Sequence, residues 1–504
     1  MYPFIFDNLG VIFDYQNKIK WSSLEFKQEI LKRVYYFSRL GINSGDKVVL
    51  IHGNNAKFFA DLFALWYLDV CAVVVDPDIG STEFKNITKF CKARFAIYCN
   101  YVPEKINIFT WRSIKFVNSS DATLIKSFPS NKVIAPSSVN IDNPALILFT
   151  SGTTGKPKGV VHTFRTLLAK LLILPQYVPL HYLEASLCLL PTHFGHGLIC
   201  NCLFPLLNKR DLVILPKFNL NLLMRLGKII DEFSITHLSS VPLVWQSVLN
   251  FSGCPKKRSL RLITCGSAPL SANLWNGIQE WSGINRVWNT YGITEVGSWI
   301  AGYNNEIVKP KSGLIGVGWG TNIAITKERE IADISTNCIK HPNEIGHIWL
   351  QTPMLMQGYL YQSDLTQEVI SGSWFYTGDL GYLTKDGLLI LSGRVRDEIN
   401  YGGMKVMPED VDFILARHKA IAESCVFGFD DEKIGQIVAA AIVFNKGIKK
   451  PSSEELKQWV SKYISNYKVP TLYFEVGEIP RTSNGKINRS EVAAFCKKRI
   501  AKSY

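Results

Sequence analysis

The sequence predicts an α/β protein: a large N-terminal domain of parallel-sheet α/β subdomains plus an irregular β-barrel, followed by a small α+β C-terminal domain. Three observations support this prediction. Short apolar runs alternate with amphipathic segments up to residue 150, a pattern typical of parallel strands joined by crossover helices. Short strand-like segments with Gly-rich turns fill residues 313–391, as in an irregular barrel. A new helix and strand pattern then starts near residue 397 and has the size of a separate domain.

The individual elements follow from local signals. Residues 22–40 predict a helix because Ser22 is a favourable N-cap, apolar residues recur at helical spacing, and Gly41 stops the pattern. We expect further helices at 54–68, 164–174, 219–233, 242–249, 409–417 and 453–464. We expect strands at 47–51, 71–75, 185–190, 211–215, 237–241, 260–265, 424–428 and 438–444.

Composition narrows the class of protein. A chain of 504 residues with 47% hydrophobic residues is long and apolar enough to form more than one core. Basic residues exceed acidic ones by 56 − 42 = 14, but they are scattered and form no run of five. This distribution does not favour a nucleic-acid partner. It suits attraction of polyanionic small molecules such as ATP or coenzyme A.

Cysteine usage and hydropathy bear on location. The chain has eleven cysteines, an odd number, and no CxxC pair, which favours free thiols in a reducing compartment. The N-terminus lacks the basic start and apolar centre of a signal peptide. No uncharged apolar stretch reaches about 18 residues, because Asp61 and Asp69 interrupt the longest candidate, 58–75. We therefore expect a cytoplasmic protein with no integral membrane segment; peripheral membrane contact is left open.

The most informative stretch is residues 145–159. Its first five residues are apolar and predict a buried strand, and the next ten read TSGTTGKPKG. Three glycines let backbone N–H groups approach an anion, while hydroxyl groups and two lysines add donors and positive charge. The stretch is not a Walker A loop, because Thr150 and Pro157 occupy positions where that motif needs Gly and Ser or Thr. The pattern predicts a loop that binds a polyphosphate.

This loop resembles the phosphate loop of the adenylate-forming enzymes, a superfamily of acyl-CoA synthetases, firefly luciferase and peptide-synthetase adenylation domains; the chain is most like a stand-alone acyl-CoA ligase. The resemblance implies that the loop binds ATP and that Thr150 takes part in catalysis and in holding Mg²⁺. The implied nucleotide contacts in the loop are Thr150, Ser151, Gly152, Thr153, Thr154, Gly155 and Lys158.

A second block, NTYGITE at residues 289–295, is similar to the YGxTE motif of the same enzymes. There the aromatic ring stacks on adenine, Thr contacts the α-phosphate and Glu helps to hold Mg²⁺, which prefers oxygen ligands. Residues 265–269, CGSAP, resemble the adenine-side segment with a mild departure. The contacts implied by these two segments are Asn289, Tyr291, Gly292, Thr294, Glu295, Gly266, Ser267, Ala268 and Pro269.

A third block, TGD at residues 377–379, resembles the ribose-binding motif of the family. The resemblance implies that Asp379 accepts hydrogen bonds from both ribose hydroxyl groups. It also implies that Arg394 binds the ribose or the α-phosphate and acts in catalysis.

Residues 393–412 resemble the family's hinge and the glycine loop beyond it. Arg396 matches the hinge residue, which divides a 1–395 domain that binds AMP and the acyl group from a mobile 396–504 lid. Gly402 and Gly403 would lie along the pantetheine tunnel. The last block, residues 480–489, resembles the motif PxTxxGKIxR. Its Lys486 would contact the region between carboxylate and α-phosphate and stabilise the charge that builds there.

The segment 191–198 matches the part of the family that lines or gates the acyl pocket. Amino-acid-activating relatives carry an Asp there, and this chain has none, so we expect a non-amino acid, either an aliphatic acid of fatty acid metabolism or an aryl acid. His193 and His196 have HxxH spacing without a third ligand nearby, which favours structural or pocket histidines over a metal site. The expected acyl-binding residues are His193, Phe194, Ser240, Val241 and Trp245.

The resemblance as a whole implies an AMP-forming acid–thiol ligase. A small carboxylic acid would react with ATP and Mg²⁺ to give acyl-AMP and pyrophosphate, and a thiol would then take the acyl group. Coenzyme A is the expected thiol, and the phosphopantetheine of a separate acyl carrier protein is the alternative. Two other classes stay open: an oxidising, luciferase-like enzyme and a non-catalytic acyl-binding protein.

Overall fold

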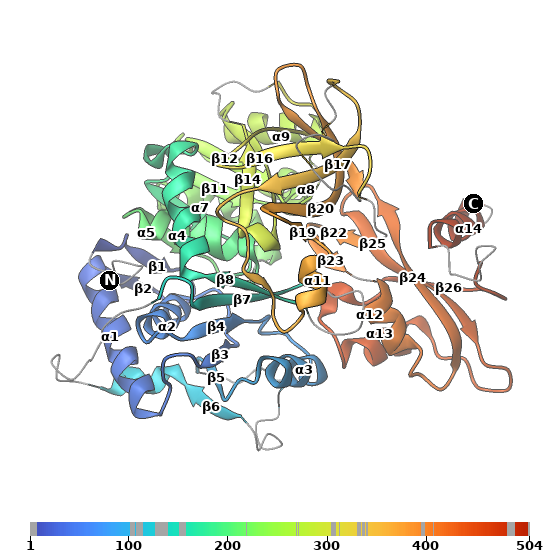
Figure 1. The fold of residues 1–504 in the computed structure, drawn as a ribbon, viewed down its shortest axis with the longest axis horizontal. Helices are drawn as coiled ribbons and strands as arrows, with labels where there is room; N and C mark the ends of the chain where they lie inside the picture. Colours follow the sequence, from blue (N-terminus) through green and yellow to red (C-terminus); the bar gives the residue numbers. More distant parts are fainter. Residues whose placement is uncertain are drawn as a thin grey trace.

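The computed structural model describes residues 8–100, 106, 114–125, 140–150, 158–217, 219–268, 270, 272–303, 309–311, 313–329, 334, 338, 341–394, 399–406, 408–480 and 489–501. These residues form three β-sheets with helices packed on them. The C-terminal sheet and its helices stand beside the rest of the molecule (Figure 1). The mixed α/β architecture with a smaller C-terminal unit confirms the predicted fold class.

The first sheet has seven strands, and its five N-terminal strands run parallel, as predicted. In spatial order its strands are β18 (Gly358–Tyr359), β8 (Lys158–Thr163), β7 (Pro144–Thr150), β4 (Cys71–Val74), β3 (Lys47–Leu50), β5 (Phe95–Tyr98) and β6 (Lys115–Asn118). Val48 and Leu50 face the core that includes α1 (Ser23–Arg39) and α2 (Ala56–Tyr67). The alternate residues Val49 and Ile51 face α3 (Ser81–Cys91). Both faces are therefore covered, as parallel sheets require.

Helix α1 starts where the sequence predicts. Ser22 is its N-cap and forms a capping box with Glu25: the Glu25 N–H donates to the Ser22 hydroxyl at 3.4 Å, and the Ser22 N–H donates to the Glu25 carboxylate at 2.8 Å. Arg33, also on α1, is fully buried and pairs with the buried Asp61 of α2, with 2.7 Å between Nε and Oδ1. The same Arg33 contacts Glu29 at 2.7 Å, and His52 lies 2.9 Å from Asp61. This network joins α1 and α2.

The second sheet has fourteen strands and changes character at β13 (Val287–Ile293). On one side of β13 the neighbouring strands are parallel to one another, except for the edge strand β2, and on the other side they are antiparallel. The parallel side and its edge comprise β12 (Leu262–Gly266), β11 (His237–Ser240), β9 (Ala185–Cys188), β10 (Asp211–Ile214), β1 (Ile12–Asp14) and β2 (Ile19–Trp21). The antiparallel side comprises β14 (Ser298–Gly302), β15 (Leu314–Gly318), β21 (Leu389–Arg394), β20 (Trp374–Leu383), β17 (Gly346–Gln351), β16 (Asn322–Thr326) and β19 (Ile370–Ser371).

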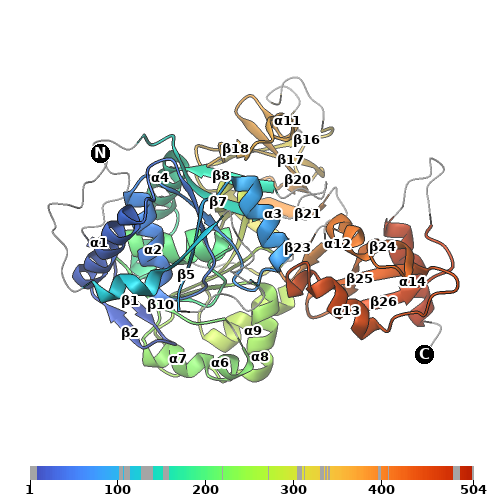
Figure 2. The same ribbon diagram turned by 90° about the horizontal axis from the view of Figure 1, so that it is seen from below.

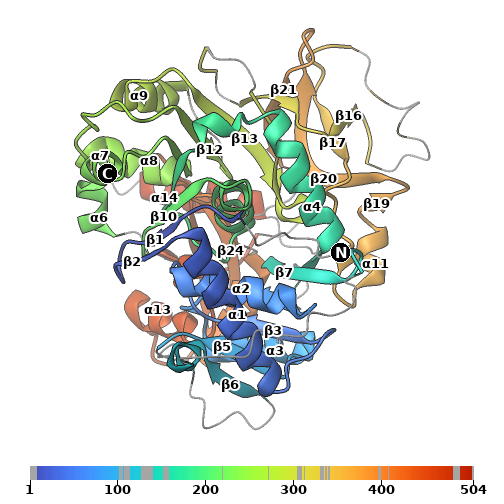
Figure 3. The same cartoon turned by 90° about the vertical axis from the view of Figure 1, so that its left-hand side faces the viewer.

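The helices of this region gather on two sides of the molecule, with α6–α9 on one side and α11 on the other (Figure 3). The α-helices are α4 (Phe164–Ile173), α5 (Phe204–Leu207), α6 (Leu220–Met224), α7 (Leu226–Glu232), α8 (Pro242–Phe251), α9 (Ala272–Ser282) and α11 (Ser363–Gln367). The other helical segments are η3 (Ser119–Leu124), η5 (Leu174–Gln176), η6 (Leu180–Tyr182), η7 (His196–Leu203) and η8 (Thr294–Val296). Segment η7 is a π-helix.

Two predicted elements differ from the structure. The single helix expected at 219–233 is divided into α6 and α7 at Arg225. Helix α7 packs directly on the chain after α8 at Gly227, where a Cβ would lie 2.2 Å from the Gly253 carbonyl oxygen. This close contact accounts for the separate placement of α7. The strand-rich segment 313–391 is present, but its described strands extend the second sheet, except for β18, which joins the first sheet, and they form no closed barrel.

The C-terminal unit has its own five-stranded sheet and two hydrophobic cores. Figure 2 shows this sheet together with the helices α12, α13 and α14. Helices α12 (Pro408–Leu415) and α13 (Ser453–Ser461) cover one face, and α14 (Arg489–Ala501) covers the other. Its remaining elements are β22 (Ile399–Tyr401), β23 (Met404–Val406), β24 (Ile421–Asp431), β25 (Gly435–Phe444), β26 (Leu472–Glu475) and η9 (Asn466–Lys468). The predicted boundary at 395/396 falls on residues outside the described part. None of the helices that the structure describes has the length and apolar character needed to span a bilayer.

The Arg33–Asp61 pair supplies a stability test. Arg33→Met leaves the Asp61 carboxylate buried without its main partner, so we expect the free energy of unfolding to fall by about 3–5 kcal/mol. Urea denaturation measures the change. Lys32→Met is the control, because Lys32 contacts the same Glu29 from a partly exposed position and should cost below about 1 kcal/mol. Equal losses in the two variants would contradict the role of the buried pair.

Candidate active site

The described residues that we predict to bind the nucleotide lie in four parts of the structure. These are the end of β7 with the start of β8, the end of β12 with the segment after it, β13 with the turn that follows it, and β20 with its neighbour β21. Several predicted residues lie outside the described part of the chain, namely Ser151, Gly152, Thr153, Thr154, Gly155, Pro269, Arg396 and Lys486. Arg394 is described through its backbone, which pairs with Asp379 across β20 and β21. The described residues nevertheless define where the phosphate loop, the adenine-side segment and the ribose-binding strand meet.

The two ends of the predicted phosphate loop are held together by a β-hairpin. Thr150 at the end of β7 is directly opposite Lys158 at the start of β8. The Lys158 ammonium lies 5.5 Å from the ring centroid of Tyr359 on β18, and the Tyr359 hydroxyl donates to the Glu295 carboxylate at 2.8 Å. Tyr359 therefore connects the loop base to the predicted metal ligand. The sequence analysis missed Tyr359, because an isolated tyrosine far from every motif carries no local signal.

Glu295 lies on the short turn η8, whose backbone is fixed from two sides. The Glu295 carbonyl oxygen accepts a hydrogen bond from the Met356 N–H at 2.7 Å, and His162 Nε2 lies 2.8 Å from the Thr294 carbonyl oxygen. The turn ends at Gly297 in the left-handed conformation, with φ of 66°, which glycine adopts without strain. These contacts fix the position of the backbone that carries the Glu295 carboxylate.

A buried polar cluster lies beneath this turn. Burial lowers the pKa of His162 to about 4, although its contact with the Thr294 carbonyl opposes the shift. Burial also lowers the pKa of Lys170 to about 8. The Lys170 ammonium donates to the carbonyl oxygens of Trp299 and Ser298 at the start of β14. Neither residue belonged to a recognised motif; His162 holds the backbone just before Glu295, and Lys170 holds the backbone after it.

Tyr291 and Asp379, predicted from separate motifs, meet in the structure. The Tyr291 hydroxyl donates to the Asp379 carboxylate at 2.5 Å, and both side chains are buried. Asp379 is positioned from the other side, because its N–H donates to the Thr377 hydroxyl at 3.0 Å. The adenine-stacking and ribose-binding residues of the resemblance therefore occupy one place, at the junction of the two halves of the second sheet.

Glycine is required at two positions beside Tyr291. A Cβ on Gly266 would lie 2.4 Å from the Thr290 hydroxyl oxygen, and a Cβ on Gly292 would lie 2.2 Å from the Ser298 carbonyl oxygen. Both distances are far below contact distance, so any larger residue would push the strands apart. Asn289 has a structural contact as well, because its amide donates to the Leu314 carbonyl at 2.8 Å.

A chain of buried polar groups leads inward from the adenine-side segment, where Ala268 follows Ser267. His196 Nδ1 lies 2.9 Å from the Ser267 hydroxyl, and His196 Nε2 lies 2.7 Å from the Ser239 hydroxyl. The Thr264 hydroxyl donates to Ser239 at 2.8 Å, and His237 lies between Thr264 and Ser186 at 3.2 and 3.1 Å. Burial lowers the pKa of both histidines to about 3, so both are neutral.

The predicted acyl-binding residues lie in two parts of the chain: His193 and Phe194 in the segment after β9, and Ser240, Val241 and Trp245 from the end of β11 into α8. His193 lies 3.8 Å from the Asp76 carboxylate, and the Phe194 ring lies 6.5 Å from Tyr467 of the C-terminal unit. Ser240 is buried, with no hydrogen-bond partner for its hydroxyl among the described residues. Trp245 is fully buried and packs against Trp281, and its contact with an acyl group stays a prediction.

The predicted tunnel glycines form the turn between β22 and β23, with φ of 56° at Gly402 and 91° at Gly403. This turn presses against the N-terminal part of the chain. A Cβ on Gly402 would lie 2.5 Å from Leu243, and a Cβ on Gly403 would lie 3.3 Å from both Val241 and Ser267. The C-terminal unit therefore contacts the adenine-side segment directly.

The base of the last motif is also fixed. Arg489, at the start of α14, donates to Asp412 at 2.7 Å and to the Val426 carbonyl at 2.6 Å. Burial raises the pKa of Asp412 to about 6, although Arg489 opposes the shift. The residues that precede Arg489, including Lys486, lie outside the described residues.

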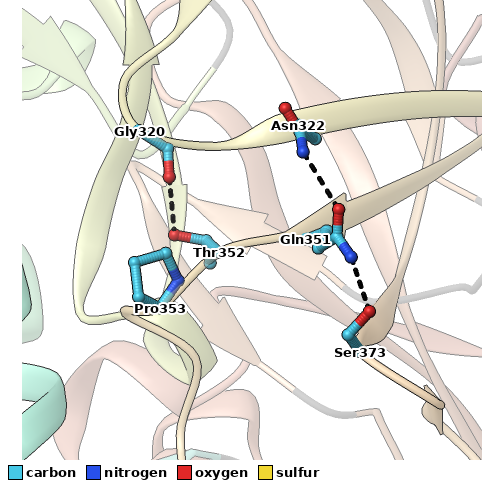
Figure 4. A pocket seen from close by; sticks show the side chains of 6 residues that line it. All are labelled: Gly320, Asn322, Gln351, Thr352, Pro353 and Ser373. Atoms are coloured by element: carbon cyan, nitrogen blue, oxygen red, sulfur yellow. Dashed lines mark hydrogen bonds between the residues drawn. The ribbon is translucent and has the colours of Figure 1, made fainter.

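A surface pocket lies away from these residues, between β16, β17 and the chain after β19 (Figure 4). It is lined by Gly320, Asn322, Gln351, Thr352, Pro353 and Ser373. Its polar side chains bond to one another: Asn322 donates to Gln351 at 2.9 Å, and Gln351 donates to Ser373 at 2.5 Å. This pocket offers no titratable group and is not a candidate catalytic site.

The donor set fits magnesium held jointly with phosphates. The described residues contain no cluster of three or more His, Cys, Asp or Glu side chains that could hold a metal alone. Mg²⁺ typically takes one or two carboxylates and completes its shell with phosphate oxygens and water. The Glu295 carboxylate and the Thr150 hydroxyl supply oxygen donors of the kind that this requirement needs.

Comparison with known proteins gives a consistent result. The model of the AMP-binding enzyme family matches residues 11–360, and the model of the AMP-binding enzyme C-terminal domain matches residues 410–486. A 2-succinylbenzoate–CoA ligase from a Geobacillus species is 27% identical over 480 residues, covering 95% of this chain and 93% of the relative. A 4-coumarate–CoA ligase from Humulus lupulus is 27% identical over 494 residues, covering 90% and 85%.

Solved structures share the fold. A double mutant of o-succinylbenzoate CoA synthetase from Bacillus subtilis, bound with the product analogue OSB-NCoA, superimposes with a TM-score of 0.85 at 23% identity, covering 97% of this chain and 96% of that chain. The same synthetase in complex with ATP and magnesium ion gives a TM-score of 0.69 at 22% identity, covering 96% of each chain.

The neutral buried histidines predict acid sensitivity. His162, His196 and His237 are uncharged in the fold, with pKa values of about 4, 3 and 3, but ionise near 6.5 when unfolded. The unfolded chain therefore binds more protons below pH 6.5, and stability that is complete above 6.5 is lost as the pH falls toward 4. At pH 5 each histidine should cost about 2 kcal/mol.

Urea denaturation at pH 7.5 and pH 5 measures this loss. In His237→Gln the loss between the two pH values should be smaller by about 2 kcal/mol, because one buried imidazole is gone. His181→Gln is the control, since His181 is exposed, and it should lose as much stability between the two pH values as the parent. Equal losses in the parent and both variants would contradict the assignment of His237 as a buried neutral histidine.

Proposed function

The chain belongs to the AMP-binding enzyme family, and from that premise we propose that it is an AMP-forming acid–thiol ligase. It activates a carboxylic acid with ATP and transfers the acyl group to coenzyme A. One observation carries the proposal: Tyr291 and Asp379 meet at 2.5 Å, beside the turn of Glu295 and the ends of the phosphate loop. The residues proposed to bind the purine, the ribose, the phosphates and the metal ion of one Mg–ATP complex therefore lie close together.

In the first step a carboxylate oxygen attacks the α-phosphorus of ATP. A new P–O bond forms, the bond to the bridging oxygen of the β-phosphate breaks, and pyrophosphate leaves. Reactions of this type depend on positioning and charge stabilisation. Thr150 and the loop after it orient the phosphates, Thr294 and Arg394 contact the α-phosphate, and Lys486 stabilises the charge between carboxylate and α-phosphate. Mg²⁺, held by Glu295 and Thr150, neutralises phosphate charge when it is bound.

In the second step the sulfur of coenzyme A attacks the acyl carbon. The acyl C–O bond breaks, AMP leaves with the electron pair, and the thiol proton is released. Gly402 and Gly403 line the route of the pantetheine arm, because a turn without side chains lets it pass. We propose that the 396–504 domain rotates about Arg396 between the steps, so that Lys486 serves the first and the glycine turn serves the second.

The acid is proposed to be an aryl or aliphatic carboxylic acid, with fatty acids among the candidates. The absence of Asp from residues 191–198 supports a substrate without an ammonium group. His193, Phe194 and Ser240 are the proposed contacts with the acyl group. A carrier-protein phosphopantetheine is the alternative thiol. A cytoplasmic location fits eleven cysteines that form no disulfide bond with one another.

The deciding experiment is pyrophosphate release from ATP with a panel of carboxylic acids. The panel should include 2-succinylbenzoate and 4-coumarate, which the names of the relatives suggest, together with fatty acids of several lengths. Each acid is tested with coenzyme A and without it. Pyrophosphate release that depends on one class of acid, with thioester formed when coenzyme A is added, supports the proposal. Inactivity with every acid would contradict it.

The role of Glu295 predicts a metal-dependent defect. Glu295→Gln keeps an acceptor for the Tyr359 hydroxyl but removes a charged ligand, so half-maximal activity should need about tenfold more Mg²⁺. Nucleotide affinity without metal should change little, because Tyr291 is intact. Tyr359→Phe is the matched control: it keeps the carboxylate, and its magnesium titration should shift less. Identical titrations for the parent and Glu295→Gln would rule out the assignment.

The role of Lys486 predicts a defect in one half-reaction. Lys486→Ala should slow pyrophosphate release by about 10²–10³-fold, since one ammonium that stabilises developing charge is lost. Thioester formation from supplied acyl-AMP and coenzyme A should stay near the parent rate. Lys498→Ala, an exposed lysine on α14, controls for net charge. Comparable losses in both half-reactions would mean that Lys486 does not act in the first step alone.

A further inference from the structure

We propose that Glu83 and Lys468 are positioning residues for thioester formation: they form an ion pair across the two domains that holds the C-terminal domain in the orientation seen here. The inference rests on the proposed function, because it assigns the pair to the second of its two steps. Glu83 lies on α3, beside the first sheet, and Lys468 lies on η9 of the C-terminal unit. Neither residue belongs to a motif that the sequence analysis used.

The pair is short and largely removed from solvent. Lys468 Nζ lies 3.1 Å from Glu83 Oε1, and the exposed fractions of the two side chains are 8% and 22%. The Ser465 hydroxyl donates to the second carboxylate oxygen at 3.5 Å. The described ion pair Lys450–Glu475 of the C-terminal unit is more than half exposed, and the more buried pair Arg489–Asp412 lies within that unit. The Glu83–Lys468 pair is both shielded from solvent and formed between the two parts of the chain.

Electrostatics makes the pair depend on the domain orientation. Burial alone would lower the pKa of Lys468, but the Glu83 carboxylate, with Tyr467 and Asp410, raises it above its ordinary value. The lysine is therefore charged, and its desolvation is offset by a partner on the other domain. A buried charge without its partner is strongly unfavourable. The buried arrangement is consequently stable only while the two domains are docked in this way.

The contacts around the pair place it next to the site. A Cβ on Gly80 would lie 3.1 Å from the Tyr463 carbonyl carbon, so the start of α3 touches the C-terminal backbone. Tyr467, which precedes Lys468, has its ring centroid 6.5 Å from that of Phe194. The same docking presses the Gly402–Gly403 turn against Ser267. One domain arrangement thus brings together the ion pair, the acyl-pocket segment and the glycine turn.

Structures of one relative with different bound molecules match the whole of this chain to different degrees. The Bacillus subtilis synthetase superimposes with a TM-score of 0.85 when bound with its product analogue OSB-NCoA. The complexes of that synthetase with AMP and with ATP and magnesium both give 0.69. The arrangement in which Glu83 meets Lys468 is therefore nearer to the relative that holds a coenzyme A product analogue.

The test separates the two half-reactions with an acid that the panel identifies. Glu83→Gln and Lys468→Met should each slow thioester formation from supplied acyl-AMP and coenzyme A by about tenfold or more. Pyrophosphate release should stay within about threefold of the parent, since that step does not use this docking. The exchanged pair, Glu83→Lys with Lys468→Glu, should recover most of the thioester rate. Lys450→Met, which removes an exposed pair, should leave both rates unchanged.

A readout without catalysis follows the domain orientation. Cys254 is the only one of the eleven cysteines that is exposed, so one dye is attached there and another to Lys457→Cys on α13. The single variants should shift the distance distribution between the dyes away from that of the parent, and the exchanged pair should restore it. Unchanged thioester rates and distances in the single variants overturn the inference, as do equal losses in both half-reactions or an exchanged pair that recovers nothing. A parent that makes no thioester from acyl-AMP instead contradicts the proposed function.

Discussion

The active-site region depends on the two different pairings of β13. This strand runs parallel to β12 on one side and antiparallel to β14 on the other. The parallel side brings the adenine-side segment to Thr290, and the antiparallel side brings β20 with Asp379 to Tyr291. Such close pairing on both sides leaves no room for side chains at Gly266 and Gly292. The position of the proposed nucleotide contacts is therefore a consequence of where a parallel sheet becomes antiparallel.

Much of this region could be predicted from the sequence because the motifs carry their own structural context. A buried apolar run predicted β7, and the capping signal at Ser22 predicted the start of α1. The resemblance assigned Tyr291 and Asp379 to the adenine and the ribose of one nucleotide, and the structure brings the two side chains into contact. Supporting residues could not be found in this way. Tyr359 and Lys170 act through contacts between elements that are distant in the chain, and no local pattern marks such contacts.

The errors have physical reasons of the same kind. Residues 219–233 have helical periodicity throughout, but the docking of Gly227 on the chain after α8 divides them. Short strands with Gly-rich turns fit an open sheet as well as a barrel, because closure depends on which strands meet at the edges. In each case tertiary packing decided between alternatives that local sequence leaves equal.

The buried chain from His237 to Ser267 has a direction. A neutral imidazole has one N–H and one bare nitrogen, so each histidine must accept from one neighbour and donate to the other. Since the Thr264 hydroxyl donates to Ser239, Ser239 donates to His196, and His196 donates to Ser267. Ser267 then keeps its own hydroxyl proton for a group outside the chain. The Ser267 hydroxyl, beside the proposed nucleotide site, therefore acts as a donor. This role is set by a series of hydrogen bonds that begins in the core of the parallel sheet.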